Sequence, residues 1–300
     1  MRRKIVQHGP NTLTISIPAD WVREHGMQKG DEVNVERVNQ GLLLTTDKGV
    51  HLQKKTINIK GIKHVTAEAF AALYKRGYDE IVIQYSTPEE RDEIHAILSR
   101  GYMGFEIIQE SPNEMYIRNV TEPSKKEFKT LFRRIFYFLL AISEDSVVAI
   151  KEHDGYQRLI QMNDNIKRLT EFCRRMIAKH GQKSYSSDTA IYYILEHLEK
   201  IAMTYTEINE HLSRRKKKTS EKYHELYMDV DKLLRVYQEL FFQFTLDKSD
   251  AFVKMHNEAQ KGLQKHMENA EKDDLELLHL FEKTSRQICS LNNPTLVLHL

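Results

Sequence analysis

The spacing of apolar residues in the second half of the chain constrains the fold more than any other feature. The apolar residues lie three or four positions apart in long series, such as Leu159, Met162, Ile166, Leu169, Cys173 and Met176, and again Tyr223, Leu226, Val230, Leu233, Tyr237, Leu240 and Phe244. Such spacing places them on one face of a helix and is typical of long helices packed side by side. We therefore expect a helical bundle from about residue 123, with helices at 124–152, 157–179, 187–213, 219–246, 250–271 and 273–291.

Residues 51–122 show a different pattern, in which short alternating stretches and helical stretches follow one another. We expect strands at 56–59, 80–84, 105–109 and 115–118 and helices at 67–75 and 88–99. Strands that alternate with helices predict a small α/β unit. The glycines of this segment do not form a phosphate-cradling loop, so it carries no nucleotide-binding motif.

The first fifty residues predict short strands around one short helix. Thr12–Ile17 alternates apolar and polar residues like a half-buried strand, and Pro18 suits the first turn of a helix that Gly26 ends. Two further strand candidates follow tight turns, the alternating stretch 32–36 and the stretch 42–46. The order strand, strand, helix, strand, strand encloses too small an interior to be stable alone, so we expect this segment to need a partner.

Composition excludes several classes of protein. The chain has 45 Lys and Arg against 43 Asp and Glu, a net charge of +2, so any nucleic-acid surface must be a local patch. Cys173 and Cys289 lie far apart with no CxxC motif, which fits a reducing cytoplasm. No stretch approaches the roughly 18 apolar residues of a membrane span, and no apolar signal-peptide region follows the N-terminus. We expect a soluble, cytoplasmic protein without membrane insertion.

A basic run opens the chain. Arg2, Arg3 and Lys4 precede the first strand, and Asn11 and Thr12 lie in the loop that leads to the next. Cations attract DNA phosphates whatever the sequence, and Asn and Thr can donate to phosphates or base edges. A solubilising terminus is the alternative explanation. Dimerisation of this segment would favour DNA binding, since two copies place six cations on one face.

The opening residues belong to a longer pattern, Gly9-x-x-x-Leu13-x-Ile15-x-Ile17-Pro18-x-x-Trp21-x-x-x-x-Gly26-Met27-x-Lys29-Gly30-Asp31-x-Val33. This pattern resembles the AbrB/MazE/SpoVT swapped-hairpin DNA-binding domain over nearly all of residues 1–47. In that family two chains interleave their hairpins into one β-barrel, and the first strand and the loop after it contact DNA.

The resemblance implies that the DNA-binding residues are Arg2, Arg3, Lys4, Asn11 and Thr12, with Arg23 on the short helix as a further candidate. Some family members carry an Arg directly after the loop glycine, where this chain has Pro10. The substitution favours binding of the DNA backbone over base readout.

The remainder resembles archaeal PhoU-type phosphate-uptake regulators, which carry such an N-terminal module ahead of a PhoU helical bundle. The similar stretches are Arg76–Ile83, Gly104–Ile107 and Asp164-x-Ile166-x-x-Leu169. A faint echo between 163–169 and 257–263 indicates two three-helix repeats. The expected organisation is a DNA-binding and dimerisation domain at 1–50, an α/β linker domain at 51–122, a PhoU-like bundle at 123–293 and a tail at 294–300.

PhoU domains often bind iron or zinc through Glu/Asp-x-x-x-Asp on their third helices, because residues four apart share one helix face. Here Met203 lies four residues after Glu199, and Arg286 lies four residues after Glu282, at the positions of the second acidic residues in that motif. We therefore expect no metal and no cofactor. The acids of the third helix are expected to form a solvated stripe, namely Glu196, Glu199, Glu207 and Glu210.

Arg214–Lys218 is a basic run between two predicted helices, either a solvated loop or a contact with DNA phosphates or an acidic partner. No catalytic triad or nucleophile elbow is recognisable, so we expect no enzyme activity. The sequence favours a dimeric DNA-binding regulator linked to phosphate uptake, with a transporter or kinase as a further partner. The alternative is an adaptor for such a partner, in which the barrel serves only for dimerisation.

Overall fold

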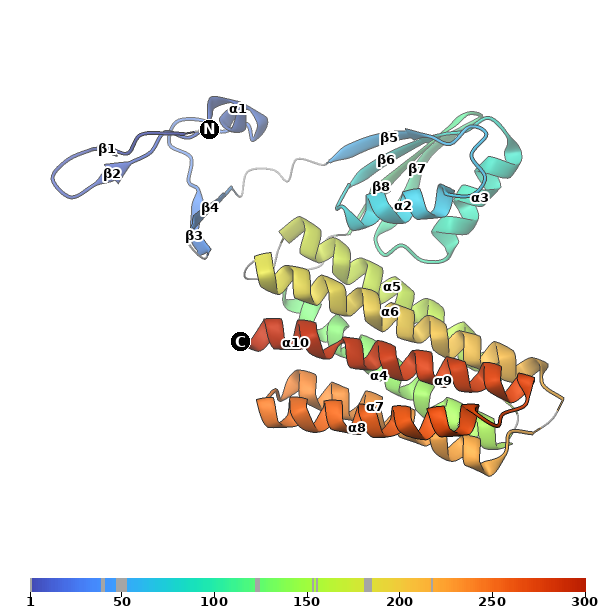
Figure 1. The fold of residues 1–300 in the computed structure, drawn as a ribbon. Helices are drawn as coiled ribbons and strands as arrows, with labels where there is room; N and C mark the ends of the chain where they lie inside the picture. The colour runs from blue at the N-terminus through green and yellow to red at the C-terminus, as the bar shows by residue number, and fades with distance from the viewer. Residues whose placement is uncertain are drawn as a thin grey trace. The chain divides into compact units, whose positions relative to one another are not determined.

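A computed structural model describes residues 2–38, 41–46, 53–121, 125–152, 154, 156–180, 185–216 and 218–300 (Figure 1). The chain divides into two compact units, Met1–Gln53 and Lys54–Leu300. The expected domain boundaries near residues 50 and 122 fall outside the described residues. None of the described helices is both long enough and apolar enough to cross a bilayer.

The first unit is a small β structure with one helix. Strands β1 (Val6–Gln7) and β2 (Leu13–Thr14) pair antiparallel, helix α1 (Ala19–Glu24) follows, and β3 (Asn34–Val38) pairs antiparallel with β4 (Gly41–Thr45). The element order agrees with the sequence prediction. The two hairpins form separate two-stranded sheets, so one chain closes no barrel within the described residues.

The first unit buries none of its described side chains. Its large apolar side chains are instead exposed on both hairpins and their flanks, namely Ile5, Val6, Leu13, Ile15, Val35, Leu42 and Leu43. Covering such side chains contributes about 1.5–3 kcal/mol each. A single copy of this unit therefore has no hydrophobic core to hold it together.

The second unit begins with a four-stranded mixed sheet. Its elements are β5 (Lys54–Asn58), α2 (Thr66–Lys75), β6 (Glu80–Gln84), α3 (Pro88–Ser99), β7 (Phe105–Ser111) and β8 (Glu114–Asn119). The strand order is β5-β6-β8-β7, in which β5 and β6 are parallel and the other neighbours antiparallel. The sequence pattern predicted every one of these elements to within a few residues.

A bundle of seven helices follows in the described residues: α4 (Lys125–Glu152), α5 (Tyr156–His180), α6 (Tyr185–Arg214), α7 (Glu221–Phe242), α8 (Leu246–Met267), α9 (Lys272–Ser290) and α10 (Asn292–His299). The helices lie side by side, and one hydrophobic core runs through the sheet and the bundle (Figure 1). Residues 294–300, expected as a tail, lie mostly in α10. Thr295 in α10 is fully buried and shares a hydrogen bond with Tyr237 of α7 over 2.9 Å.

Two cations of α5 join the sheet to the bundle. Arg175 donates to the Asp79 carboxylate over 2.8 Å and to the carbonyls of Tyr74 and Tyr78 over 3.0 and 2.7 Å. Lys179 donates to the same carboxylate over 2.6 Å. Because Tyr74 lies in the last turn of α2, Arg175 also satisfies a carbonyl at the negative end of that helix.

Candidate nucleic-acid interface

The β1–β2 hairpin presents a tight polar tip. Gly9 has a φ of +80°, a left-handed conformation that glycine adopts without strain. The His8 backbone N–H donates to the Thr12 carbonyl over 2.7 Å and closes the loop. Asn11 and Thr12 are exposed at this tip, so their side chains are free to meet a ligand.

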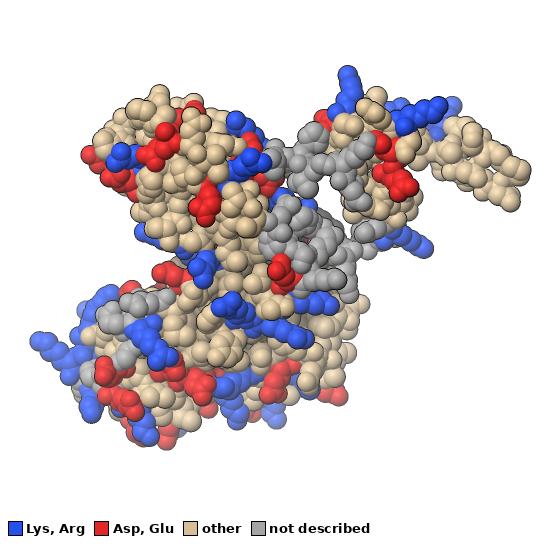
Figure 2. Space-filling model, turned by 180° about the vertical axis from the view of Figure 1, so that it is seen from behind, with Lys and Arg blue, Asp and Glu red and all other residues tan. Residues whose placement is uncertain are grey.

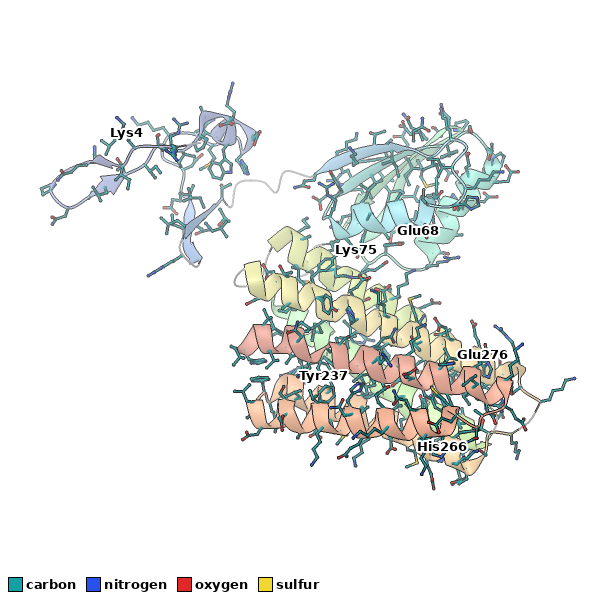
Figure 3. All side chains as sticks on the ribbon, in the orientation of Figure 1. Lys4, Glu68, Lys75, Tyr237, His266 and Glu276 are labelled. Atoms are coloured by element: carbon teal, nitrogen blue, oxygen red, sulfur yellow. The ribbon has the colours of Figure 1, made fainter. Side chains whose placement is uncertain are left out.

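The basic residues lie at the other end of the same hairpin. Arg2, Arg3 and Lys4 are exposed and precede β1. Lys4 lies toward the end of the hairpin nearer α1 (Figure 3). At 3.3 Å per residue, Lys4 is about 13 Å along the strand from the start of the tip at His8. One chain therefore presents the predicted cations and the predicted polar donors as two separate groups.

Charge is distributed in the same way. Residues 5–19 contain no Lys, Arg, Asp or Glu, and Figure 2 shows the hairpin as an uncharged projection at the right edge of that view. A phosphate attracted by charge would therefore approach the base of the hairpin, where Arg2, Arg3 and Lys4 lie. The tip has no Lys or Arg side chain and can contribute polar hydrogen bonds.

Arg23 is held by its own helix. Its Nε donates to the Ala19 carbonyl one turn earlier in α1, over 3.3 Å, while the residue remains exposed. Pro18, expected in the first turn, is instead the N-cap one residue ahead of the helix, and Gly26, with a φ of +57°, follows the last turn as the sequence predicts. Figure 1 shows α1 at the same end of the first unit as the start of the chain, and the remaining guanidinium donors of Arg23 are free for a phosphate.

The expected solvated acidic stripe on α6 is wrong for its first half. Glu196 and Glu199 both bind the guanidinium of Arg174, an α5 residue that is only 1% exposed. Thr170 also donates to the Glu199 carboxylate over 2.9 Å. The sequence pattern missed this because the acids meet a cation buried on the neighbouring helix. Glu207 and Glu210 do lie at the surface, and Glu207 accepts from Lys283.

In the two stretches that would carry metal ligands in a PhoU domain, the acidic residues pair with arginine side chains instead. Glu199 contacts Arg174, and Glu282 accepts from Arg286 over 2.7 Å. Within the described ranges, no group of three His, Cys, Asp or Glu side chains is arranged to hold a metal ion.

The basic run after α6 is partly internal. Arg215 is buried and forms ion pairs with Asp273 and Asp274 at the start of α9, at 2.9 and 2.6 Å. Acidic side chains in the first turn also favour the α9 dipole. Lys216 and Lys218 are exposed, whereas Lys217 lies outside the described residues. The solvated-loop interpretation therefore fails for Arg215.

The comparisons with known proteins bear on the first unit. The family model described as antidote-toxin recognition MazE, a bacterial antitoxin, matches residues 6–50. Residues 6–50 form a MazE/AbrB-type domain. MazE-type domains bind DNA and dimerise. Searches of curated proteins and of solved structures gave no match.

Proposed function

We propose that this protein is a dimeric, non-enzymatic DNA-binding transcriptional regulator. The observation that carries the proposal is the MazE-type match over residues 6–50, in a unit whose exposed N-terminal arm holds Arg2, Arg3 and Lys4. The arm supplies the sequence-independent attraction to phosphates, and Asn11, Thr12 and Arg23 add polar contacts. Such a protein acts on chromosomal DNA, and hence in the cytoplasm.

The dimer is proposed to form through the first unit. Leu13 and Leu42, on the two hairpins, are 69% and 70% exposed in one chain. A second copy that interleaves its hairpins with the first would bury these side chains and supply the missing core. It would also bring two basic arms together.

The remainder of the chain is proposed to act as the regulatory part. The order of a small α/β unit and a helical bundle supports the resemblance to PhoU-type phosphate-uptake regulators. We assign the protein on this basis to phosphate uptake or signalling, with a phosphate transporter or kinase as a partner for the bundle. An antitoxin-type role is the other regulation that the MazE match allows.

The test measures DNA binding by the full chain with Arg2, Arg3 and Lys4 all changed to Ala. The probe is a fluorescent random-sequence duplex of about 30 base pairs at low salt, where phosphate contacts dominate affinity. We expect affinity to fall about tenfold or more. A matched control changes Lys254, Lys261 and Lys265, three exposed lysines of α8, to Ala.

The control removes the same charge from the bundle and should bind DNA as the unmodified protein does. Equal losses of DNA affinity in the two variants would show that the net charge of the protein alone attracts the DNA. Unchanged binding by the arm variant would refute the assignment of the arm. A dimer that binds no DNA at all would favour the adaptor alternative.

A further inference from the structure

The second unit contains a cavity of about 450 Å³ where α2 and the end of α3 meet α5 and α6. Glu68, Ala71 and Lys75 come from one face of α2, and Arg100 and Tyr102 come from the segment after α3. Figure 3 shows Glu68 and Lys75 on the side of α2 that faces the bundle. The volume lies within the range of small-molecule sites.

The bundle supplies the opposite wall with helical regularity. Asn163, Lys167 and Glu171 lie four residues apart along α5, and Glu199 and Met203 lie four apart along α6. Two helices that each turn one face toward the same space form a continuous wall. Most of the cavity wall thus comes from helices, and Arg100, Gly101 and Tyr102 of the turn after α3 complete it.

Two of the polar groups that line this cavity are buried acceptors. Glu171 is 5% exposed and, among the described residues, takes part in no hydrogen bond or ion pair. The amide oxygen of Asn163 is buried without a hydrogen-bond partner. Glu199, by contrast, has Arg174 as its partner. An unpaired buried carboxylate and an unpaired buried amide oxygen both lack a donor.

The electrostatics agree with this geometry. Burial, followed by the charge of Glu199, raises the pKa of Glu171. The positive charges of Lys167 and Lys75 lower this pKa, and neither lysine forms an ion pair with the carboxylate. Burial, Glu171 and Glu199 together raise the pKa of Tyr102, so its hydroxyl stays protonated.

The outer edge of the cavity has the opposite character. Apart from Glu199, which pairs with Arg174, its exposed or half-exposed charged side chains are four cations and two acids, Lys75, Arg100, Lys167, Arg168, Glu68 and Asp164. A simple cation would be repelled at this edge, and a simple anion would be repelled by Glu171. A molecule with a positive group and a negative group a few ångströms apart suits both the buried carboxylate and the basic edge. Ala67, Ala71, Ile97 and Met203 line the rest of the wall with apolar surface.

We propose that this cavity binds an α-amino acid with an apolar side chain. The ammonium group would donate to the Glu171 carboxylate and the Asn163 amide oxygen, and the carboxylate would lie against Lys75 and Lys167. The apolar side chain would lie between α2 and α6 at Ala71 and Met203. This site requires neither DNA binding nor dimerisation, so it goes beyond the proposed function.

The test is isothermal titration calorimetry of the full chain with six L-amino acids: alanine, valine, leucine, isoleucine, methionine and phenylalanine. We expect at least one to bind with a Kd below about 1 mM. Two analogues of the best binder, one without the carboxylate and one without the amine, should bind at least about tenfold more weakly. No binding below that Kd by any of the six, or an analogue that binds equally well, would overturn the proposal.

Variants locate the site. Glu171→Gln keeps the size of the side chain and removes its charge, so it should weaken binding about tenfold or more. Lys167→Gln should weaken binding of the amino acid and leave binding of the analogue without the carboxylate unchanged. Glu225→Gln, which changes an exposed acid of α7, is the matched control and should bind normally. Normal binding by a folded Glu171→Gln variant, checked by its thermal unfolding, would place the amino acid elsewhere and refute the assignment.

Discussion

Arg175 of α5 and Asp79, just ahead of β6, form an ion pair of 2.8 Å in which the two side chains are only 3% and 1% exposed. This pair joins the sheet to the bundle, with Lys179 on the same carboxylate. Removing one partner of a buried pair leaves the other charge uncompensated. Such a loss is far more costly than losing a pair at the surface.

We therefore expect Asp79→Ala to lower the free energy of unfolding of the second unit by about 3–5 kcal/mol. Chemical denaturation followed by far-UV circular dichroism measures this. Asp145→Ala is the matched control, because Asp145 pairs with Arg158 over 3.1 Å at the surface. Its loss should cost less than about 1 kcal/mol. Similar values for the two variants would contradict the structural role of Asp79.

Glu171→Gln should stabilise the protein when no ligand is bound. Folding raises the pKa of this carboxyl above its ordinary value of 4.5, so the protonated form is favoured in the folded state. The stabilising contribution of the proton is complete below pH 4.5 and is lost as the pH rises through the folded value. Gln imitates the protonated form at every pH.

The variant should thus gain about 1–3 kcal/mol over the unmodified protein at pH 8 and nearly nothing near pH 4. Thermal unfolding across this pH range gives the difference. A gain that is the same at all pH values would point to better packing. A loss at pH 8 would show that the ionised carboxylate has a partner in the folded chain.

Leu13→Asp should prevent dimerisation. A carboxylate placed among the apolar side chains of the two hairpins would have to be desolvated in the interleaved dimer. Sedimentation equilibrium should then show monomers at concentrations where the unmodified protein is dimeric. Val148→Asp, at a site on α4 that is 49% exposed, is the control and should remain dimeric. A dimer with Asp at position 13 would mean that the chains associate through another surface.

The salt dependence of DNA binding should reveal how many cations of the arms touch phosphates. Two copies of Arg2, Arg3 and Lys4 supply six positive charges. Each phosphate contact adds about 0.9 to the slope of log K against log salt concentration. The triple Ala variant should therefore lower the magnitude of the slope by up to about 5. Titrations from low to moderate salt measure both slopes, and identical slopes would exclude the arms from the interface.

Local signals predicted most of the second unit. Helix α3 has the bounds expected from the sequence, because Pro88 lies in its first turn and Thr87 forms a capping box with Glu90. The apolar residues of β6 likewise fixed its bounds as Glu80–Gln84. Residues 294–300 were not expected to be helical, since α10 is short and extends no long apolar series.

Which side chains contact one another across helices could not be predicted in the same way. Helical spacing shows that Arg174 and Glu199 each lie on a helix, but it does not say that α5 turns Arg174 toward α6. The cavity was missed for the same reason, because its residues come from four separate segments. Glu171 carries no motif, and its isolation from any partner is visible only in three dimensions. The proposed DNA-binding residues, from Arg2 to Arg23, remain a sequence prediction.

The first unit has no buried side chain among its described residues, and this determines how many chains must meet for it to fold. The segment Lys54–Leu300 has a core of its own within one chain. If the first unit takes its core from a second chain, as we propose, its folding is second order in protein concentration. Dilution should melt the MazE-type domain while the bundle stays folded. The amount of protein in the cell then sets the fraction of chains that display a paired basic arm.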